Sequence, residues 1–450
     1  LPTAQFPNHH RGTYIPTEGT RPVRLSYRAE IRPTPRQRRA LLQHAGNARW
    51  AYNWGLAKHK EAYAKWVSEG KPKKWHGWPS AISLHRDLNV MKKLEPDAGG
   101  VPWMYEASKC APQEALRNLD VAFKNFLSGR AKYPRFKSRN HGVGGFRLTG
   151  TIKADRSTIR LPTIGRVRFQ PGERGYLPWG AQPQVTVTEK AGRWFVTVVG
   201  PEVEDAAPNG KPTEGLDLGV ARLATLSNET VIENPKAQAL GQRKIKKLQK
   251  EVSRKKKGSA NRRKAKATLA KAHARVANVR RDALHKATTT IAKSHGKVVI
   301  EDLKVKNMTK GGRGKRGLNR VMLDAAFGEF RRLLEYKGKL YGCEVIAVPP
   351  HCTSQRCSAC GHVEKGNRTS QAGFRCLSCG YEVNADLNAA INILEAASSS
   401  DSLNACGGDV RPNQLWLAGQ TPVKQEPGIF QIFVGRFSPG VLLAKGGGQV

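Results

Sequence analysis

Hydrophobic and polar residues alternate in the first half of the chain, with one long helical stretch inside it. Residues 23–31 alternate and predict a half-buried strand, and residues 146–199 return to the same period of two, with hairpins expected at 159–169 and 185–199. From residue 34 to residue 126, hydrophobic positions recur instead at steps of three and four, as in helices. A single strand, a helical insertion and several further strands predict a small β-barrel interrupted by helices.

The second half of the chain has the pattern of an α/β unit. A first short strand at 215–219 has the sequence Gly-Leu-Asp-Leu-Gly, and a later run at 297–303 is apolar enough for a buried strand. A helix is expected at 318–341 and a further strand at 344–348. The segment 200–213, rich in Pro, Asp and Glu, is typical of a linker between this unit and the barrel.

Four cysteines follow in two closely spaced pairs, Cys357 with Cys360 and Cys376 with Cys379. Each pair has the Cys-x-x-Cys spacing, and two such pairs can surround one tetrahedral Zn²⁺ ion without leaving an open coordination position. Scattered buried thiols are the alternative, but the paired spacing argues against it. The motif predicts a zinc ribbon with one structural Zn²⁺ ion.

Three acidic residues occupy positions where their side chains can meet. Asp217 lies on the first strand of the second half, Glu301 ends the later buried strand, and Asp386 opens a helix behind the cysteines. We prefer Glu301 to its neighbour Asp302, because alternation along a strand cannot direct both at one site. Three acids at one sheet edge suit two Mg²⁺ ions, which stabilise the attacking and leaving oxygens of a phosphate displacement. For Asp386 alone, an ordinary helix N-cap is the alternative.

The net charge indicates the class of partner. With 77 Lys and Arg against 35 Asp and Glu, the chain has a formal charge of +42, which favours a polyanion and first of all a nucleic acid. No apolar run approaches the roughly 18 residues that a membrane span requires. The polar N-terminus lacks the apolar core of a signal peptide, so we expect a cytoplasmic protein without a membrane partner.

Much of this charge lies in one basic helical hairpin that turns at residues 258–261. Between residues 243 and 286 the sequence has 18 Lys and Arg but only two acids. A solvated helix face is the ordinary explanation of a charge run, but here there are too few acids for i,i+4 ion pairing. We therefore expect an arm that contacts phosphates, with these candidates near its turn: Lys255, Lys256, Arg262 and Arg263.

In combination, these motifs resemble the signatures of the transposon-encoded TnpB (OrfB) family and of the small type V CRISPR effectors related to it. The resemblance extends from about residue 20 to about residue 396. Many relatives have Asp-Arg-Asp where this chain has Asn384-Ala-Asp386, which keeps the second acid. The chain's size and its tail are more similar to TnpB than to a CRISPR effector. The resemblance rests mainly on Gly215-Leu-Asp217-Leu-Gly219, Val299-Ile-Glu301-Asp-Leu303, Thr353-Ser-Gln355, Cys357-Ser-x-Cys360, Phe374-x-Cys376-x-x-Cys379 and Asp386-x-Asn388-Ala-Ala.

The resemblance implies a multidomain α+β fold. A β-barrel (wedge) domain with an inserted helical recognition domain is followed by a RuvC/RNase H-like α/β nuclease domain with an inserted zinc ribbon. The expected boundaries are a disordered N-terminus at 1–20, the wedge domain at 21–33 and 134–205, the recognition insertion at 34–133, the nuclease domain at 206–349 and 383–396, the ribbon at 350–382, and a disordered tail at 397–450.

The family's activity implies an RNA-guided DNA endonuclease. A guide RNA would pair with one strand of a double-stranded DNA target, and the protein itself would read only a short motif beside it. The resemblance maps the family's RuvC triad, with its Mg²⁺ ions, onto Asp217, Glu301 and Asp386, and the Zn²⁺ ligands onto the four paired cysteines. Arg368, in the ribbon loop, is a candidate contact to the scissile strand, with an ordinary surface arginine as the alternative.

Two other functions suit a basic, nucleic-acid-binding chain. The first is a DNA-binding repressor without cleavage, guided by RNA or not. Such a protein has no need to hold three acids together against their repulsion, so the retained triad argues against it. The second is a transposase that joins DNA itself, which needs its own strand-transfer nucleophile, and no His-hydrophobic-His pair accompanies the tyrosines of this chain. The sequence favours the guided nuclease.

Overall fold

The structure, a computed structural model, describes most of the first 398 residues. The expected disordered N-terminus at 1–20 lies outside the described residues. So does the expected tail at 397–450, apart from its first two residues, which end a helix. None of the described helices combines the length and the apolar character that crossing a bilayer requires. The described ranges are 23–72, 74–139, 142–170, 177–178, 180–311 and 314–398.

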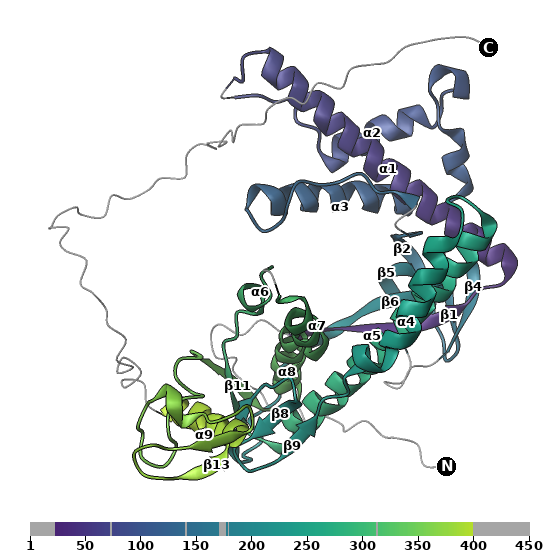
Figure 1. Cartoon of the computed structure of the whole chain (residues 1–450). Helices are drawn as coiled ribbons and strands as arrows, with labels where there is room; N and C mark the ends of the chain where they lie inside the picture. The colour runs from purple at the N-terminus through teal and green to yellow at the C-terminus, as the bar shows by residue number, and fades with distance from the viewer. Residues whose placement is uncertain are drawn as a thin grey trace. The chain divides into compact units, whose positions relative to one another are not determined.

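Six antiparallel strands close into a barrel in the order β1-β4-β3-β2-β5-β6 (Figure 1). Alternation of apolar residues produces it: in β2, Phe146, Leu148, Ile152 and Ala154 are buried while the residues between them are more exposed. Closure leaves no unpaired strand edge in the barrel. The hairpins expected at 159–169 and 185–199 are confirmed as β3–β4 and β5–β6. The strands are β1 (Val23–Arg32), β2 (Gly145–Ala154), β3 (Thr158–Leu161), β4 (Gly165–Gln170), β5 (Gly180–Lys190) and β6 (Arg193–Val203).

Helices occupy the chain between β1 and β2. The first begins with a capping box, in which the Thr34 hydroxyl accepts from the backbone N–H of Gln37 and the Gln37 side chain accepts from the N–H of Thr34. Their buried residues form one apolar core with the interior of the barrel. The expected barrel interrupted by helices is therefore confirmed. The elements are α1 (Pro35–Ser68), α2 (Ala81–Met91), η1 (Pro96–Ala98), η2 (Pro102–Glu106) and α3 (Cys110–Leu127).

The second half forms a five-stranded sheet in the order β11-β10-β7-β8-β9. Strand β10 pairs in parallel with both β7 and β11, whereas β7, β8 and β9 form an antiparallel meander. Counted within this sheet, the order is 5-4-1-2-3, that of the RuvC/RNase H-like class, as expected from the sequence. The strands are β7 (Thr213–Asp217), β8 (Arg222–Leu226), β9 (Val231–Glu233), β10 (Lys297–Glu301) and β11 (Glu344–Val348).

Helices cover both faces of this sheet, which explains the continuous apolar run of β10. Val298 and Ile300 pack with residues of α5 (Ala260–Ser294) and α8 (Phe327–Tyr341). Val299, between them in the sequence, packs on the opposite face against Ile393 of α9 (Ala385–Ser398). The central strand is thus buried on both sides and fixes the positions of α5, α8 and α9.

The expected single helix at 318–341 is wrong, because two helices occupy this segment. Ala326 has a φ of 54° and turns the chain between α7 (Arg316–Ala325) and α8. The turn lets the two helices face different partners. Helix α8 packs on the sheet, whereas Asp324 of α7 forms an ion pair with Arg280 of α5.

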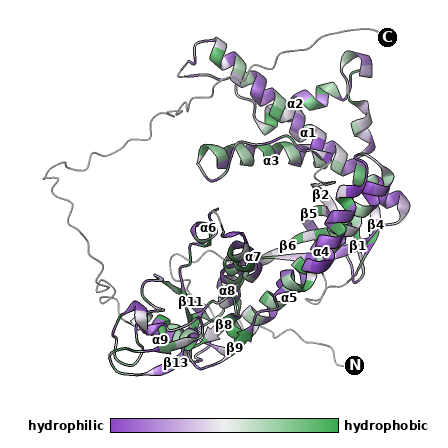
Figure 2. Cartoon of the chain, viewed as in Figure 1, coloured by the Kyte–Doolittle hydropathy of each residue, from purple (hydrophilic) through white to green (hydrophobic). Residues whose placement is uncertain are grey.

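Helices α4 (Ala237–Arg254) and α5 lie side by side as a long hairpin (Figure 1). Only Ala237 and Ile245 of α4 are buried, and Figure 2 shows how hydrophilic this helix is. A short helix, α6 (Val305–Met308), follows β10. Between β11 and α9 lies the cysteine-containing segment, with the turn η4 (Lys365–Asn367) and a hairpin of β12 (Gly373–Arg375) and β13 (Glu382–Asn384).

The close contact between α9 and β7 generates a stability prediction. A Cβ atom on Gly215 would lie 2.0 Å from the carbonyl oxygen of Ala390 and 2.7 Å from the nitrogen of Leu394, both backbone atoms of α9. Gly215→Ala should therefore force the helix away from the strand and destabilise the protein by about 1–3 kcal/mol, as overpacking does. We expect a lower midpoint of thermal unfolding, measured by circular dichroism.

Gly328→Ala is the matched control. Gly328 lies in α8, and a Cβ atom there would meet no atom within 4 Å, so its unfolding midpoint should stay the same or rise slightly. Equal midpoints for Gly215→Ala and the wild type would contradict the close contact.

Candidate active site

The three predicted acids come from three elements that end or begin at one edge of the sheet. Asp217 ends β7, Glu301 ends β10 and Asp386 lies in the first turn of α9. Strands β7 and β10 are parallel neighbours, with Leu216 opposite Ile300, so their last residues emerge side by side. All three acids line one cavity of about 800 Å³.

The electrostatics of this cavity are those of crowded, buried carboxylates. Burial first, and then the charges of Glu301 and Asp386, together raise the pKa of Asp217 to about 7, while Arg368 opposes the shift. Burial also raises the pKa of Glu301, against a hydrogen bond from Thr353 that lowers it. Anions held together in this way are relieved by a cation, and carboxylate oxygens are what a hard divalent cation prefers. The donor set therefore fits Mg²⁺.

Glu301 and its neighbour Asp302 have different contacts. The Thr353 hydroxyl donates to Glu301 Oε1 at 2.5 Å, whereas the Asp302 carboxylate pairs with Arg331 of α8. Both residues line the cavity, but only Glu301 raises the pKa of Asp217. The role of Glu301 stays a prediction, and its position is compatible with it.

The beginning of α9 leaves Asp386 available to the cavity. The backbone N–H of Asp386 donates to the Asn384 side chain at 3.0 Å, so Asn384 supplies an acceptor at this helix end. Arg368 Nη2 lies 3.7 Å from Asp386 Oδ1 and also donates to the carbonyl of Gln371. Arg368 lines the cavity, and its contact to the scissile strand stays a prediction.

The four paired cysteines come together as one cluster, with all four sulfur atoms within 4.8 Å of one another. The Sγ atoms of Cys357 and Cys379 are 3.7 Å apart, and those of Cys360 and Cys376 are 3.6 Å apart. A tetrahedron with metal–sulfur bonds of about 2.3 Å has edges of about 3.8 Å, so these separations suit a bound metal ion. Four sulfur ligands fill such a site, which makes it structural rather than catalytic.

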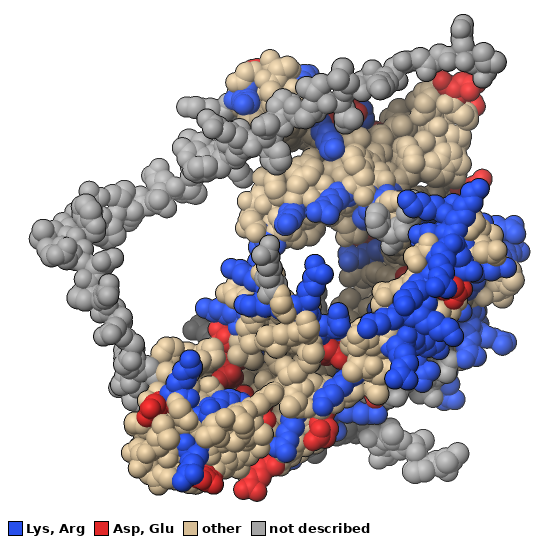
Figure 3. Space-filling model, viewed as in Figure 1, with Lys and Arg blue, Asp and Glu red and all other residues tan. Residues whose placement is uncertain are grey.

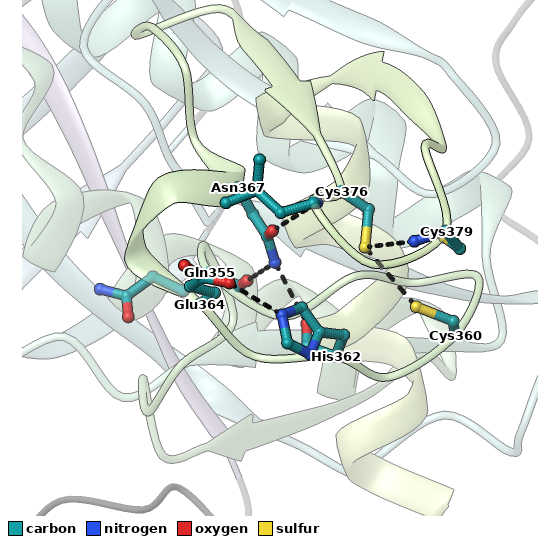
Figure 4. Close-up of polar contacts among 8 residues, drawn as sticks. Gln355, Cys360, His362, Glu364, Asn367, Cys376 and Cys379 are labelled. Atoms are coloured by element: carbon teal, nitrogen blue, oxygen red, sulfur yellow. Dashed lines mark hydrogen bonds and ion pairs between the residues drawn. The ribbon is translucent and has the colours of Figure 1, made fainter.

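Asn367 links the two halves of this cluster, as Figure 4 shows. Its side chain is fully buried, donates to the carbonyls of Gln355 and His362, and accepts from the N–H of Leu377. Gln355 and His362 flank the first cysteine pair, and Leu377 lies within the second. Nothing in a single sequence distinguishes Asn367 from a loop asparagine, so its role was not predicted.

Two amides of α9 fasten the cysteine segment to the helix. Asn388 is fully buried, donates to the carbonyl of Arg356 at 2.7 Å and accepts from the N–H of Ser358 at 3.0 Å. Asn392 donates to the carbonyls of Thr353 and Arg356 at 2.9 and 2.7 Å. The sequence signal for Asn388 and Asn392 is their spacing, because residues four apart lie on one face of a helix. Two buried amides on that face need hydrogen-bond partners.

The four basic candidates lie at the turn of the α4–α5 hairpin, away from the acids. Figure 3 shows Lys and Arg side chains gathered over this hairpin. Helix α5 contacts the sheet core around Leu284, which lies 24 residues beyond Ala260, or about 36 Å along a helix. Arg262 and Arg263 each donate to a backbone carbonyl of the turn, and Lys255 pairs with Glu251. Lys256 is exposed.

The raised pKa of Asp217 generates a prediction for the protein in Mg²⁺-free buffer. Asp217 has a pKa of about 7 in the fold and about 4 in the unfolded chain. Its ionisation therefore opposes folding increasingly as the pH rises from about 4 to about 7, and by a constant amount above that. Asp217→Asn keeps a side-chain oxygen that can accept the N–H of Leu218, but its amide does not ionise. The variant should therefore be more stable than the wild type at pH 8 by up to about 4 kcal/mol.

Thermal unfolding of both proteins between pH 5 and pH 8.5 measures this difference. The advantage of Asp217→Asn should grow with pH and level off above pH 7. An advantage that is independent of pH would show that burial and repulsion do not raise this pKa.

The cysteine cluster generates a second prediction. Cys376→Ser removes a buried ligand, so bound metal should fall below one ion per chain and the ribbon should lose stability, because a structural metal contributes directly to folding. Metal content by mass spectrometry and the unfolding midpoint are the measurements. Ser378→Ala, an exposed residue between Cys376 and Cys379, is the control and should leave both unchanged. Full metal content in Cys376→Ser would contradict the ligand role.

Three protein-family models match the chain. A model described as a probable transposase (OrfB_IS605) matches residues 185–311, a helix-turn-helix model (HTH_OrfB_IS605) matches residues 23–66, and a Cas12f1-like TNB model matches residues 327–393. Over residues 23–66 the structure has strand β1 and most of the single helix α1, rather than two helices joined by a turn.

Curated relatives match nearly the whole chain. A putative RNA-guided DNA endonuclease, InsQ, of Escherichia coli strain K12 is 37% identical over 420 residues, which cover 89% of this chain and 97% of that protein. A putative RNA-guided DNA endonuclease of Streptomyces pristinaespiralis is 35% identical over 413 residues, covering 90% of this chain and 96% of that protein. The CRISPR-associated endodeoxyribonuclease Cas12f1 of Sulfoacidibacillus thermotolerans is 36% identical over 124 residues, covering 26% and 28%.

Proposed function

Because the chain belongs to the TnpB (OrfB) family, we propose that it is an RNA-guided DNA endonuclease that hydrolyses phosphodiester bonds at a single RuvC site. The observation that carries this proposal is the convergence of Asp217, Glu301 and Asp386 on one cavity at the edge of the sheet. The full-length similarity to relatives named as RNA-guided DNA endonucleases supports the same activity.

Asp217, Glu301 and Asp386 would hold two Mg²⁺ ions. When bound, these ions stabilise the attacking and the leaving oxygen of an in-line displacement at phosphorus. The raised pKa of Asp217 in the metal-free protein reflects how strongly this position demands a compensating cation. Thr353 orients Glu301 through its hydroxyl, and Arg368 offers a guanidinium to a phosphate of the scissile strand beside Asp386.

The four cysteines would hold one structural Zn²⁺ ion. Their closed geometry leaves no position for a reacting water, so the ribbon would contribute by its shape and by the placement of Arg368. The cavity of the three acids and the ribbon would then have separate tasks. Hydrolysis would take place in the cavity, and the ribbon would position Arg368.

A structured guide RNA and a double-stranded DNA target would be the partners. The formal charge of +42 requires a polyanion, and relatives of this chain are named as RNA-guided. We assign the barrel at 21–33 and 134–205 as a wedge domain, the insertion at 34–133 as a recognition domain, and 206–349 with 383–396 as the nuclease domain around the ribbon at 350–382. Lys255, Lys256, Arg262 and Arg263 would contact nucleic-acid phosphates at the hairpin turn, too far along α5 to reach the cut bond.

No observation favours a cleavage-inactive DNA-binding protein. A protein that only binds has no use for three acids whose mutual repulsion raises the pKa of Asp217. The three acids are therefore better explained by catalysis than by binding.

Asp217→Ala tests this proposal. The variant should lose at least about 100-fold in the rate of DNA cleavage, because it lacks a ligand that acts only in chemistry, while guide RNA and target binding stay close to those of the wild type. Cleavage of a labelled target and binding by filter retention, both with the co-purified RNA, are the measurements.

Asp302→Asn is the matched control for this test. Asp302 is the adjacent acid of the same cavity, but its carboxylate is paired with Arg331, so cleavage should persist. Loss of RNA binding in Asp217→Ala, or cleavage equal to that of Asp302→Asn, would refute the assignment of this acid.

A further inference from the structure

Thr353 lies between strand β11 and the first cysteine pair and contacts one of the three acids, Glu301. It is 6% exposed. Its hydroxyl donates to Glu301 Oε1 at 2.5 Å, across 52 positions of the sequence. Its backbone carbonyl accepts from the side chain of Asn392, which is itself 4% exposed. Both the side chain and the backbone of Thr353 are thus held by hydrogen bonds.

We propose that Thr353 is a positioning residue that orients the Glu301 carboxylate for a divalent cation, and that Asn392 of α9 holds Thr353 in place for this purpose. The inference rests on the proposed function, because it assigns Glu301 to the metal site. It adds a residue that touches neither the metal nor the nucleic acid.

The contact constrains Glu301 in two ways. A free glutamate has several rotatable bonds, and ordering it on metal binding costs up to about 2 kcal/mol. A hydroxyl that already holds Oε1 removes part of that cost and leaves Oε2 directed away from Thr353. A hydrogen bond to one carboxylate oxygen also stabilises the ionised form, which is the form that binds a cation.

Asn392 makes the position of Thr353 depend on α9. Its amide bridges the carbonyls of Thr353 and Arg356, and Arg356 precedes the first ribbon cysteine. Helix α9 also supplies Asp386. One helix therefore places one acid directly and a second acid through Thr353.

The test compares Thr353→Val, which keeps the shape but removes the hydroxyl, with Thr353→Ser, which keeps the hydroxyl. The full-length protein with its co-purified RNA is titrated with Mn²⁺, and binding is followed by electron paramagnetic resonance, with Asp217→Ala as the blank for sites on the RNA. Partners outside the ligand shell of a metal site typically change affinity by roughly 10–100-fold. We expect Thr353→Val to weaken Mn²⁺ binding by that factor and Thr353→Ser to stay within about threefold of the wild type.

Cleavage gives an independent readout. The Mg²⁺ concentration for half-maximal cleavage should rise in Thr353→Val by a similar factor, and saturating Mg²⁺ should restore most of the rate. A merely structural role would instead lower the rate at every Mg²⁺ concentration. If Thr353→Val does not fold, Thr353→Ala serves in its place, since it also lacks the hydroxyl but places no new methyl group where the hydroxyl was.

Three results would overturn the inference. If Asp217→Ala loses Mn²⁺ and Thr353→Val does not, Thr353 does not position Glu301, although the metal site stands. If Thr353→Ser is as defective as Thr353→Val, packing rather than the hydroxyl is responsible. A wild type that binds Mn²⁺ no better than Asp217→Ala would refute the proposed metal site itself, and this inference with it.

Discussion

The packing of α9 directly on β7 is the contact on which the rest of the site depends. Gly215 lacks a Cβ atom, and the backbone of α9 occupies that space. At this short separation the first turn of the helix reaches the edge of the sheet, where Asp386 meets Asp217. The same helix carries Asn388 and Asn392, which bind the backbone that leads into the ribbon. The distance between one helix and one strand therefore determines where the acids meet and where the ribbon is attached.

This arrangement opposes folding in the absence of a cation. Burial and like charges raise the pKa of Asp217, so an ionised cluster destabilises the folded state. Three contacts counter it: the Thr353 hydroxyl on Glu301, the N–H of Leu218 on Asp217, and the guanidinium of Arg368. The large apolar core on both faces of β10 offsets the remainder. Strain confined to a functional site and balanced elsewhere is typical of catalytic centres.

The sequence predicts those parts of the structure that are set by local patterns. Alternation in residues 146–199 predicts the barrel hairpins, the apolar run of β10 predicts a doubly buried strand, and the cysteine spacing predicts the sulfur cluster, because each depends on residues close in sequence. The break at Ala326 was missed, since its cause is the different partners of α7 and α8. The contacts of Thr353 and Asn392 were not predicted, because hydrogen bonds across 52 and 39 residues leave no periodic trace.

The position of the ribbon in the chain explains how a metal ion held by the four cysteines would influence the three acids, none of which belongs to the ribbon. The ribbon is inserted between β11 and α9, so the segment that enters it carries Thr353 and its loop carries Arg368, and both line the acid cavity. Asp217 and Glu301 end strands of the sheet and need no ribbon to be placed. Arg368 and Thr353 depend on it, through Asn367 between the knuckles and the two amides of α9. Folding of the cysteine cluster therefore completes the cavity without supplying any acid, so a metal ion held by the four cysteines would act on the surroundings of the acids and not on the acids themselves.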